Sequence, residues 1–228
     1  MEHHHHVVQQ PEGTAQQLIL LFHAVGDNPV AMGQIGEYFA QAFPQALVVS
    51  VGSPEPSPDG AGLQWYAQEG EDDENRPARI AAALPRLIAL VRYWQQVSGV
   101  GYAATALVGF SQGATMALEA VRSEPDLAGR VIAFSGRFAT LPQHKLGDTV
   151  VHLLHGSEDP RVALVHAQAA ERQLRSTGTD VTLDIEPVGH AINAALMEAA
   201  LERMRAYIPR RYWDEALSGK RGEIVAYR

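Results

Sequence analysis

Short apolar segments alternate with longer amphipathic segments along most of the chain. The short segments have the length of buried strands, and the longer ones have the spacing of helices with one apolar face. The pattern predicts strands at residues 18–22, 46–51, 104–110, 131–134, 150–154 and 181–185, and helices at residues 28–42, 75–97, 113–121, 162–175 and 191–207. Strands that alternate with helices pair in parallel and carry helices on both faces. The sequence therefore predicts an α/β fold with a mostly parallel central sheet.

Two features interrupt this alternation. Residues 52–75 are rich in proline, glycine and acidic residues and show no period, which predicts a long loop. Loops of that length in a compact domain are usually functional. Pro85 lies inside the helix predicted at residues 75–97, and we expect it to kink or break that helix. No insertion is large enough for a separate cap domain, so the long loop is expected to be the main wall of any site.

The alternation runs without an internal repeat and predicts one α/β domain over residues 18–208. Residues 1–17 are expected to be a solvated N-terminal segment, in which His3–His6 are either native or the remnant of a tag. Residues 209–228 form a C-terminal tail for which the pattern predicts no structure.

Composition excludes several classes of protein. The chain has 228 residues and no cysteine, which excludes disulfides, metal–thiolate sites and a thiol nucleophile. Its formal net charge of −8 argues against a nucleic-acid partner, because phosphate binding depends on clustered lysine and arginine. The longest apolar run is far below the roughly 20 residues of a membrane helix, and the N-terminus lacks the pattern of a signal peptide. We expect a cytoplasmic protein that does not insert into a membrane.

The candidate chemistry centres on the motif Gly-Phe-Ser-Gln-Gly at residues 109–113. This G-x-S-x-G motif follows an apolar strand and precedes a helix of small residues, a setting that predicts a serine on a tight strand-to-helix turn. Side chains at Gly109 and Gly113 would collide across such a turn. The N-terminal N–H groups of the helix would point to where an oxyanion develops. We interpret Ser111 as a nucleophile; the alternative is a turn with a capping serine.

A serine hydroxyl requires a neighbouring base, and in such folds the acid and then the histidine follow the serine along the chain. His190 lies between the last strand and the last helix, at the sheet edge where these folds place their sites. We therefore expect His190 to be the base. The other histidines that follow the serine are expected to have packing or surface roles: His152 and His155 in an apolar strand, His144 in a polar loop, and His166 on a helix.

The acid is expected in the loop after the strand at residues 150–154. Asp159 precedes Pro160, which keeps the aspartate out of helical geometry and suits a fixed orienting group. Glu158 is the alternative, and both carboxylates could instead be capping or solvent-facing groups. We expect Asp159 to orient His190.

These motifs together resemble the phospholipase/carboxylesterase family of α/β-hydrolases, which includes the acyl-protein thioesterases. The resemblance is carried by residues 109–113, by His-Gly-Ser-Glu-Asp-Pro at residues 155–160 and by Gly189-His190. It implies an α/β-hydrolase fold without a cap domain and a serine esterase or thioesterase activity. Residues 91–95 and 212–218 also resemble the small bacterial serine esterases of that family.

The resemblance implies further site residues. Residues 21–28 are similar to the oxyanion loop of the family, so the backbone N–H groups of Val25 and Gln112 would form the oxyanion hole. Trp65 resembles an element that lies beside the active site. The family usually has glycine at the position of Ala24, whose methyl group is expected to face the acyl pocket. His23 is expected to orient the loop, with contact to the substrate as the alternative.

The sequence thus predicts a serine hydrolase that cleaves small carboxylic esters or thioesters through an acyl-enzyme, with no metal or organic cofactor. A lipase or lysophospholipase, a peptidase and a non-catalytic binding module on the same fold are the alternatives. A dienelactone hydrolase of the usual kind would need a cysteine. Acyl chain length and the choice between a monomer and a homodimer are left open.

Overall fold

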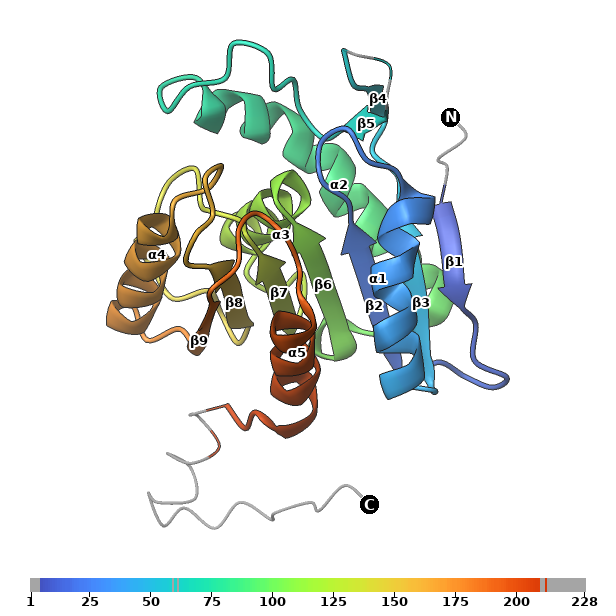
Figure 1. Cartoon of the computed structure of the whole chain (residues 1–228). Coiled ribbons are helices and arrows are strands. Elements are labelled where there is room, and N and C mark those ends of the chain that lie inside the picture. The colour runs from blue at the N-terminus through green and yellow to red at the C-terminus, as the bar shows by residue number, and fades with distance from the viewer. Residues whose placement is uncertain (1–4, 59, 61, 210–211, 213–228) are drawn as a thin grey trace.

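The computed structural model describes residues 5–58, 60, 62–209 and 212, and its centre is a seven-stranded sheet (Figure 1). The strands lie in the order β1-β3-β2-β6-β7-β8-β9. They are β1 (His5–Gln9), β2 (Gln17–Phe22), β3 (Ala46–Val51), β6 (Thr105–Phe110), β7 (Arg130–Phe134), β8 (Val150–Gly156) and β9 (Val181–Glu186). Every neighbouring pair is parallel except β1 with β3, which is antiparallel. The predicted mostly parallel α/β sheet is confirmed.

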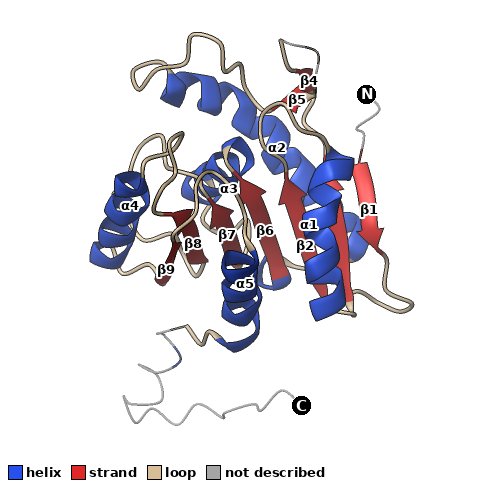
Figure 2. Cartoon of the chain, viewed as in Figure 1, coloured by secondary structure: helices blue, strands red, loops and turns tan. Residues whose placement is uncertain are grey.

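Helices cover both faces of this sheet (Figure 2). The helices are α1 (Pro29–Ala42), α2 (Arg76–Ser98), α3 (Gln112–Ser123), α4 (Leu164–Ser176) and α5 (Ala194–Ala206). Successive side chains of a strand point to opposite faces, and in β2 Leu20 joins the core under α2, α3 and α4, whereas Leu21 joins the core under α1 and α5. Both faces are therefore apolar, as expected for parallel strands that are buried on both sides.

The start of α1 illustrates how local sequence sets an element. Asn28 is the N-cap, and its Oδ1 accepts hydrogen bonds from the amides of Val30 and Ala31 at 3.0 and 3.1 Å. Pro29 occupies the first helical position, where no intrahelical donor is needed. The predicted helix therefore begins at the position that the capping residues indicate.

Strand β1 corrects the expected N-terminal boundary of the domain. Residues 5–9 pair with β3, with His6 opposite Ser50, and a Cβ added to Gly33 of α1 would overlap the His6 ring. The segment is short, shows no clear period and pairs with residues far along the chain, so local pattern does not reveal it. The sheet starts before Leu18. The predicted tail at residues 209–228 falls largely outside the described residues, as do His3 and His4.

Two further predictions concern the region between β3 and β6. The long loop contains two short strands, β4 (Glu55–Pro56) and β5 (Leu63–Gln64), which pair antiparallel. Pro85 does not break α2, which runs through it, because Pro85 lies on the exposed face where water can solvate the carbonyl that loses its amide partner.

No helix in the described part of the chain is long and apolar enough to cross a membrane.

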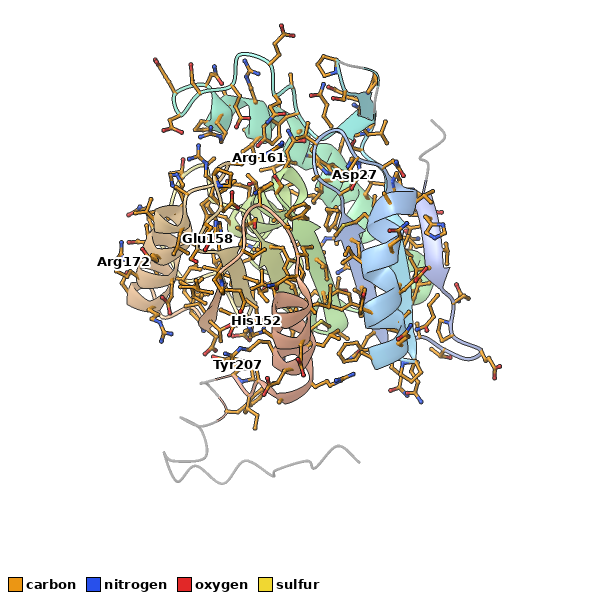
Figure 3. All side chains as sticks on the ribbon, viewed as in Figure 1. Asp27, His152, Glu158, Arg161, Arg172 and Tyr207 are labelled. Atoms are coloured by element: carbon orange, nitrogen blue, oxygen red, sulfur yellow. The ribbon has the colours of Figure 1, made fainter. Side chains whose placement is uncertain are left out.

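His152 is a buried polar residue of β8 on the face that α5 covers (Figure 3). Its Nε2 lies 3.0 Å from the guanidinium of Arg130, and its Nδ1 lies 2.8 Å from Oγ1 of Thr182. A guanidinium only donates, so Nε2 is the acceptor and Nδ1 donates to the threonine. Burial, followed by the charges of Arg130 and Arg203, lowers the pKa of His152 to about 3. The predicted packed, hydrogen-bonded role of this histidine is confirmed.

His152 should make the fold sensitive to acid. In the unfolded chain a histidine titrates near its reference pKa of about 6.5, whereas folded His152 stays neutral. The contribution of His152 to the free energy of unfolding is therefore complete above about pH 6.5. It is lost as the pH falls toward the pKa of the folded state. Between about pH 7.5 and pH 4.5 the free energy of unfolding should lose roughly 2–3 kcal/mol from this group. Urea unfolding gives the free energy of unfolding at both pH values. The difference between these two free energies should be smaller by that amount in His152→Asn than in the wild type. An unchanged difference would contradict the assignment.

Candidate active site

Ser111 lies on the turn between β6 and α3 in a conformation that L-residues rarely adopt. Its φ is 54° and its ψ is −115°. Two backbone hydrogen bonds hold this turn: Ser111 N donates to Phe134 O at 2.9 Å, and Thr115 N donates to Ser111 O at 3.0 Å. The neighbouring strand β7 and the first turn of α3 therefore stabilise the strained serine.

Glycine is required on both sides of this turn because other backbone comes very close. A Cβ added to Gly109 would lie 2.5 Å from Cα of Ala114. A Cβ added to Gly113 would overlap Phe22 O and lie 2.6 Å from His23 O. The predicted collision across the turn is confirmed at Gly109. At Gly113 the close approach is instead to the end of β2, so the first turn of α3 lies against that strand.

The three residues singled out from sequence as nucleophile, base and acid lie in one hydrogen-bonded row. His190, in the loop between β9 and α5, has Nε2 at 2.9 Å from Ser111 Oγ and Nδ1 at 2.7 Å from Asp159 Oδ2. A carboxylate only accepts, so Nδ1 carries the proton and Nε2 is free to accept from the serine hydroxyl. The ring of Phe110 packs against the His190 ring, with 5.0 Å between centroids.

Asp159 is buried, and its carboxylate accepts three hydrogen bonds. Oδ1 accepts from the amides of Arg161 and Val162 at 2.8 and 2.9 Å, while Oδ2 accepts from His190. Burial raises the pKa of Asp159, but the hydrogen bonds from Val162, His190 and Arg161 outweigh it and hold the pKa below its ordinary value. Asp159 is therefore ionised at neutral pH. Glu158, the alternative acid, is exposed to solvent (Figure 3).

Two backbone amides at this sheet edge keep their donors unused. β2 and β6 are parallel neighbours with Phe22 opposite Gly109, so the loops after these strands leave the same edge of the sheet. Within the described residues, neither the Val25 amide nor the Gln112 amide donates to a protein acceptor. Both N–H groups are thus available to a bound molecule.

The side chain of Gln112 ties the long loop to the turn. Its Oε1 accepts from Trp65 N at 2.7 Å, and its Nε2 donates to Tyr66 O at 2.9 Å. The sequence predicts a role only for the backbone amide of Gln112, because nothing local indicates side-chain partners more than forty residues away. Trp65 is 3% exposed, so it lies beside the turn with its ring inside the protein.

The ring of His23 has no exposed surface, so it does not contact a substrate. It supports the loop after β2 (residues 23–28) from inside, which favours the orienting role that the sequence suggested. Ala24, the next residue, is partly exposed.

A cavity of about 220 Å³ lies between the long loop and α2. It is lined by Pro54, Glu55, Trp65, Tyr66, Ala67, Arg79, Ala82, Ala83, Arg86, Leu87 and Leu90. None of Ser111, Asp159 and His190 lines it. Two of its lining residues, Trp65 and Tyr66, are the ones whose backbone binds Gln112, so one wall of the cavity is connected to the serine turn.

No group of three or more histidine, aspartate or glutamate side chains in the described residues is arranged to hold a metal ion.

The sheet order and the serine turn after β6, with an aspartate and a histidine after β8 and β9, define an α/β-hydrolase. Residues 3–208 match the phospholipase/carboxylesterase family, and the chain belongs to that family. It is an esterase of this family, as the resemblance implied.

Individual relatives agree with this placement. The chain is 58% identical to esterase YpfH of Escherichia coli (strain K12) over 220 residues, which cover 96% of this chain and 95% of the relative. Among solved structures, esterase PE8 is 28% identical with a TM-score of 0.80, covering 87% of this chain and 97% of its own. The carboxylesterase of Bacillus cereus has the same fold at 18% identity, with a TM-score of 0.75 and 94% of each chain covered.

The close approach at Gly113 should not tolerate a methyl group. In a helix, alanine is favoured over glycine by up to about 1 kcal/mol. The overlap with Phe22 O should reverse that sign and lower the free energy of unfolding by roughly 1–3 kcal/mol in Gly113→Ala, with loss of esterase activity. The matched control is Gly101→Ala, since an added Cβ there meets nothing within 4 Å. Equal stability of the two variants in urea would contradict the constraint.

Proposed function

We propose that the protein is a serine esterase that hydrolyses small carboxylic esters or thioesters through an acyl-enzyme. Ser111 is the nucleophile, His190 is the general base and Asp159 orients the base. The observation that carries the proposal is the row of hydrogen bonds in which His190 contacts Ser111 Oγ at 2.9 Å and Asp159 Oδ2 at 2.7 Å. A nucleophile, a base and an orienting group in mutual hydrogen-bond reach are the requirement for this chemistry.

The reaction proceeds in two acyl transfers. His190 Nε2 takes the proton of Ser111 as Oγ bonds to the carbonyl carbon, and the carbonyl oxygen becomes an oxyanion. When the tetrahedral intermediate collapses, the bond to the leaving alcohol or thiol breaks and that group takes the proton from His190. Water then attacks the acyl-enzyme in the same way, which releases the acid and restores Ser111.

The oxyanion is bound by the backbone N–H groups of Val25 and Gln112 in this proposal. Both amides are free of protein acceptors in the described residues, and Gln112 also begins α3, whose N-terminal dipole favours negative charge. Ala24 lies beside Val25 and is partly exposed, so its methyl group would face the acyl part of the substrate. Trp65 would act from the side away from the substrate, by holding the wall of the site in place.

The test is a substrate panel with Ser111→Ala as the reference. The wild type should hydrolyse p-nitrophenyl acetate and butyrate and an acyl thioester much faster than a long-chain ester or a peptide amide. Ser111→Ala should lose several orders of magnitude in kcat on every substrate, because the nucleophile is absent. Its far-UV circular dichroism spectrum and unfolding midpoint should match those of the wild type.

Each other outcome would overturn a part of this proposal. Substantial activity in folded Ser111→Ala would remove the serine mechanism. A preference for long-chain esters in micelles would indicate a lipase or lysophospholipase, and a preference for amides a peptidase. No turnover of any substrate by the wild type would indicate a binding module.

The neighbouring carboxylates Asp159 and Glu158 provide an internal control for the acid. Asp159→Asn should lower kcat by about 10⁴-fold, the loss seen when the same group of a chymotrypsin-like triad becomes an amide, because His190 is left in the wrong tautomer. Glu158→Gln should change kcat by less than about threefold, since this side chain is exposed and the carboxylate bound to His190 is that of Asp159. Initial rates on p-nitrophenyl acetate compare the two, and the reverse order would assign the role to Glu158.

A further inference from the structure

The buried ring of His23 binds one backbone group on each side. We propose that His23 is a positioning residue: its Nδ1–H holds the carbonyl of Ala24 and thereby aims the Val25 amide at the oxyanion. The proposal rests on the serine-esterase function and adds a residue that does not touch the substrate.

The hydrogen bonds of His23 determine its tautomer. Ser53 N lies 3.1 Å from Nε2, and an amide nitrogen can only donate, so Nε2 is the acceptor. The single proton of the neutral ring is then on Nδ1, which lies 2.7 Å from Ala24 O and donates to it. Burial lowers the pKa of His23 and outweighs the hydrogen bond to Ala24 and the charge of Asp27, which raise it. The ring therefore stays neutral at neutral pH.

The geometry of the peptide bond transmits this contact. The carbonyl of Ala24 and the amide of Val25 belong to the same peptide unit, and in a trans peptide C=O and N–H point in opposite directions. The described residues contain no cis peptide bond. Because Ala24 O is held toward the fully buried His23 ring, the Val25 N–H is directed away from that ring. Rotation of the peptide between Ala24 and Val25 would point the Val25 N–H, the proposed donor, away from the oxyanion.

The ring is itself fixed in place, so it can serve as a reference point. The indole Nε1 of Trp65 donates to His23 O at 2.9 Å, and the Trp65 and His23 rings pack with centroids 5.2 Å apart. Trp65 is in turn bound through its backbone to the Gln112 side chain. One connected network thus joins the two residues whose amides form the proposed oxyanion hole.

Asparagine and glutamine each reproduce one half of the ring. In His23→Asn the side-chain nitrogen stands near the place of Nδ1 and can donate to Ala24 O. In His23→Gln the longer side chain places an acceptor near the position of Nε2 for Ser53 N, and the donor to Ala24 O is lost. Comparing the two variants therefore separates two effects of the ring: holding the Ala24 carbonyl and accepting the hydrogen bond of the Ser53 amide.

The two possible roles of His23 predict opposite orders of kcat for the two variants. If His23 only stabilises the fold, His23→Gln should be the more active variant; if it positions the peptide, His23→Asn should be. His23→Asn leaves the buried Ser53 amide without an acceptor, which should lower the urea midpoint of unfolding. In His23→Gln the Ala24 carbonyl still accepts from Asp27 N at 3.2 Å, so this variant should be the more stable one. We nevertheless expect kcat on p-nitrophenyl acetate to fall about 10- to 100-fold in His23→Gln and less than about fivefold in His23→Asn, with little change in KM. The full loss of an oxyanion donor, about 10²- to 10³-fold, is the upper limit.

The affinity for a trifluoromethyl ketone, which forms a tetrahedral oxyanion with the serine, should fall in parallel with kcat in His23→Gln. Equal kcat in the two variants, or a larger loss in His23→Asn, would overturn the positioning role. If Ser111→Ala is inactive while His23→Gln keeps the wild-type kcat, only the positioning role fails. Activity in Ser111→Ala removes the proposed function itself.

One measurement needs no folded variant. Long-range ¹H–¹⁵N spectra of the wild type distinguish the two neutral tautomers of a histidine, and His23 should show the proton on Nδ1 at neutral pH. A proton on Nε2 would overturn the proposal even if neither substitution yields a folded protein.

Discussion

The approach of α3 to the end of β2 is the constraint on which the rest of the site depends. At Gly113 the helix backbone reaches the carbonyls of Phe22 and His23, a distance that leaves no room for a side chain. Ser111 stands two positions before this contact, and the loop carrying Val25 begins immediately after it. One packing contact between two backbones therefore brings the serine turn and the loop after β2 to the same edge of the sheet.

Buried hydrogen bonds then determine the direction of each polar group. Asp159 receives two amides and one imidazole, so its charge is retained although the side chain is buried. The tautomers of His23, His152 and His190 follow in the same way from partners that can only donate or only accept. Groups held in this manner need little reorganisation when charge develops in a reaction, which is the condition for electrostatic catalysis.

Local sequence predicted those parts of the fold that local interactions determine. The Asn28-Pro29 cap predicted the start of α1, and the G-x-S-x-G motif between a strand and a helix predicted the serine turn. Strand β1 was missed because its partner lies some forty residues further on, and the alternative in which Pro85 breaks α2 is wrong because Pro85 lies on the face of the helix that meets water. The site followed the same division: loops after strands indicated the candidate triad, but the contacts of His23 and Gln112 form only when the chain is folded.

The attachment of the long loop at Trp65 and Tyr66 divides that loop into a constant and a changeable part. The backbone there is bound to Gln112, so its position is coupled to the serine turn. Pro54 and Glu55 line the same cavity but take no part in that attachment. Substitutions at these outer residues can therefore reshape the cavity while the backbone at Trp65 and Tyr66 stays bound to Gln112. The inner part of the loop keeps its place beside the serine turn, and the outer part is free to vary in sequence.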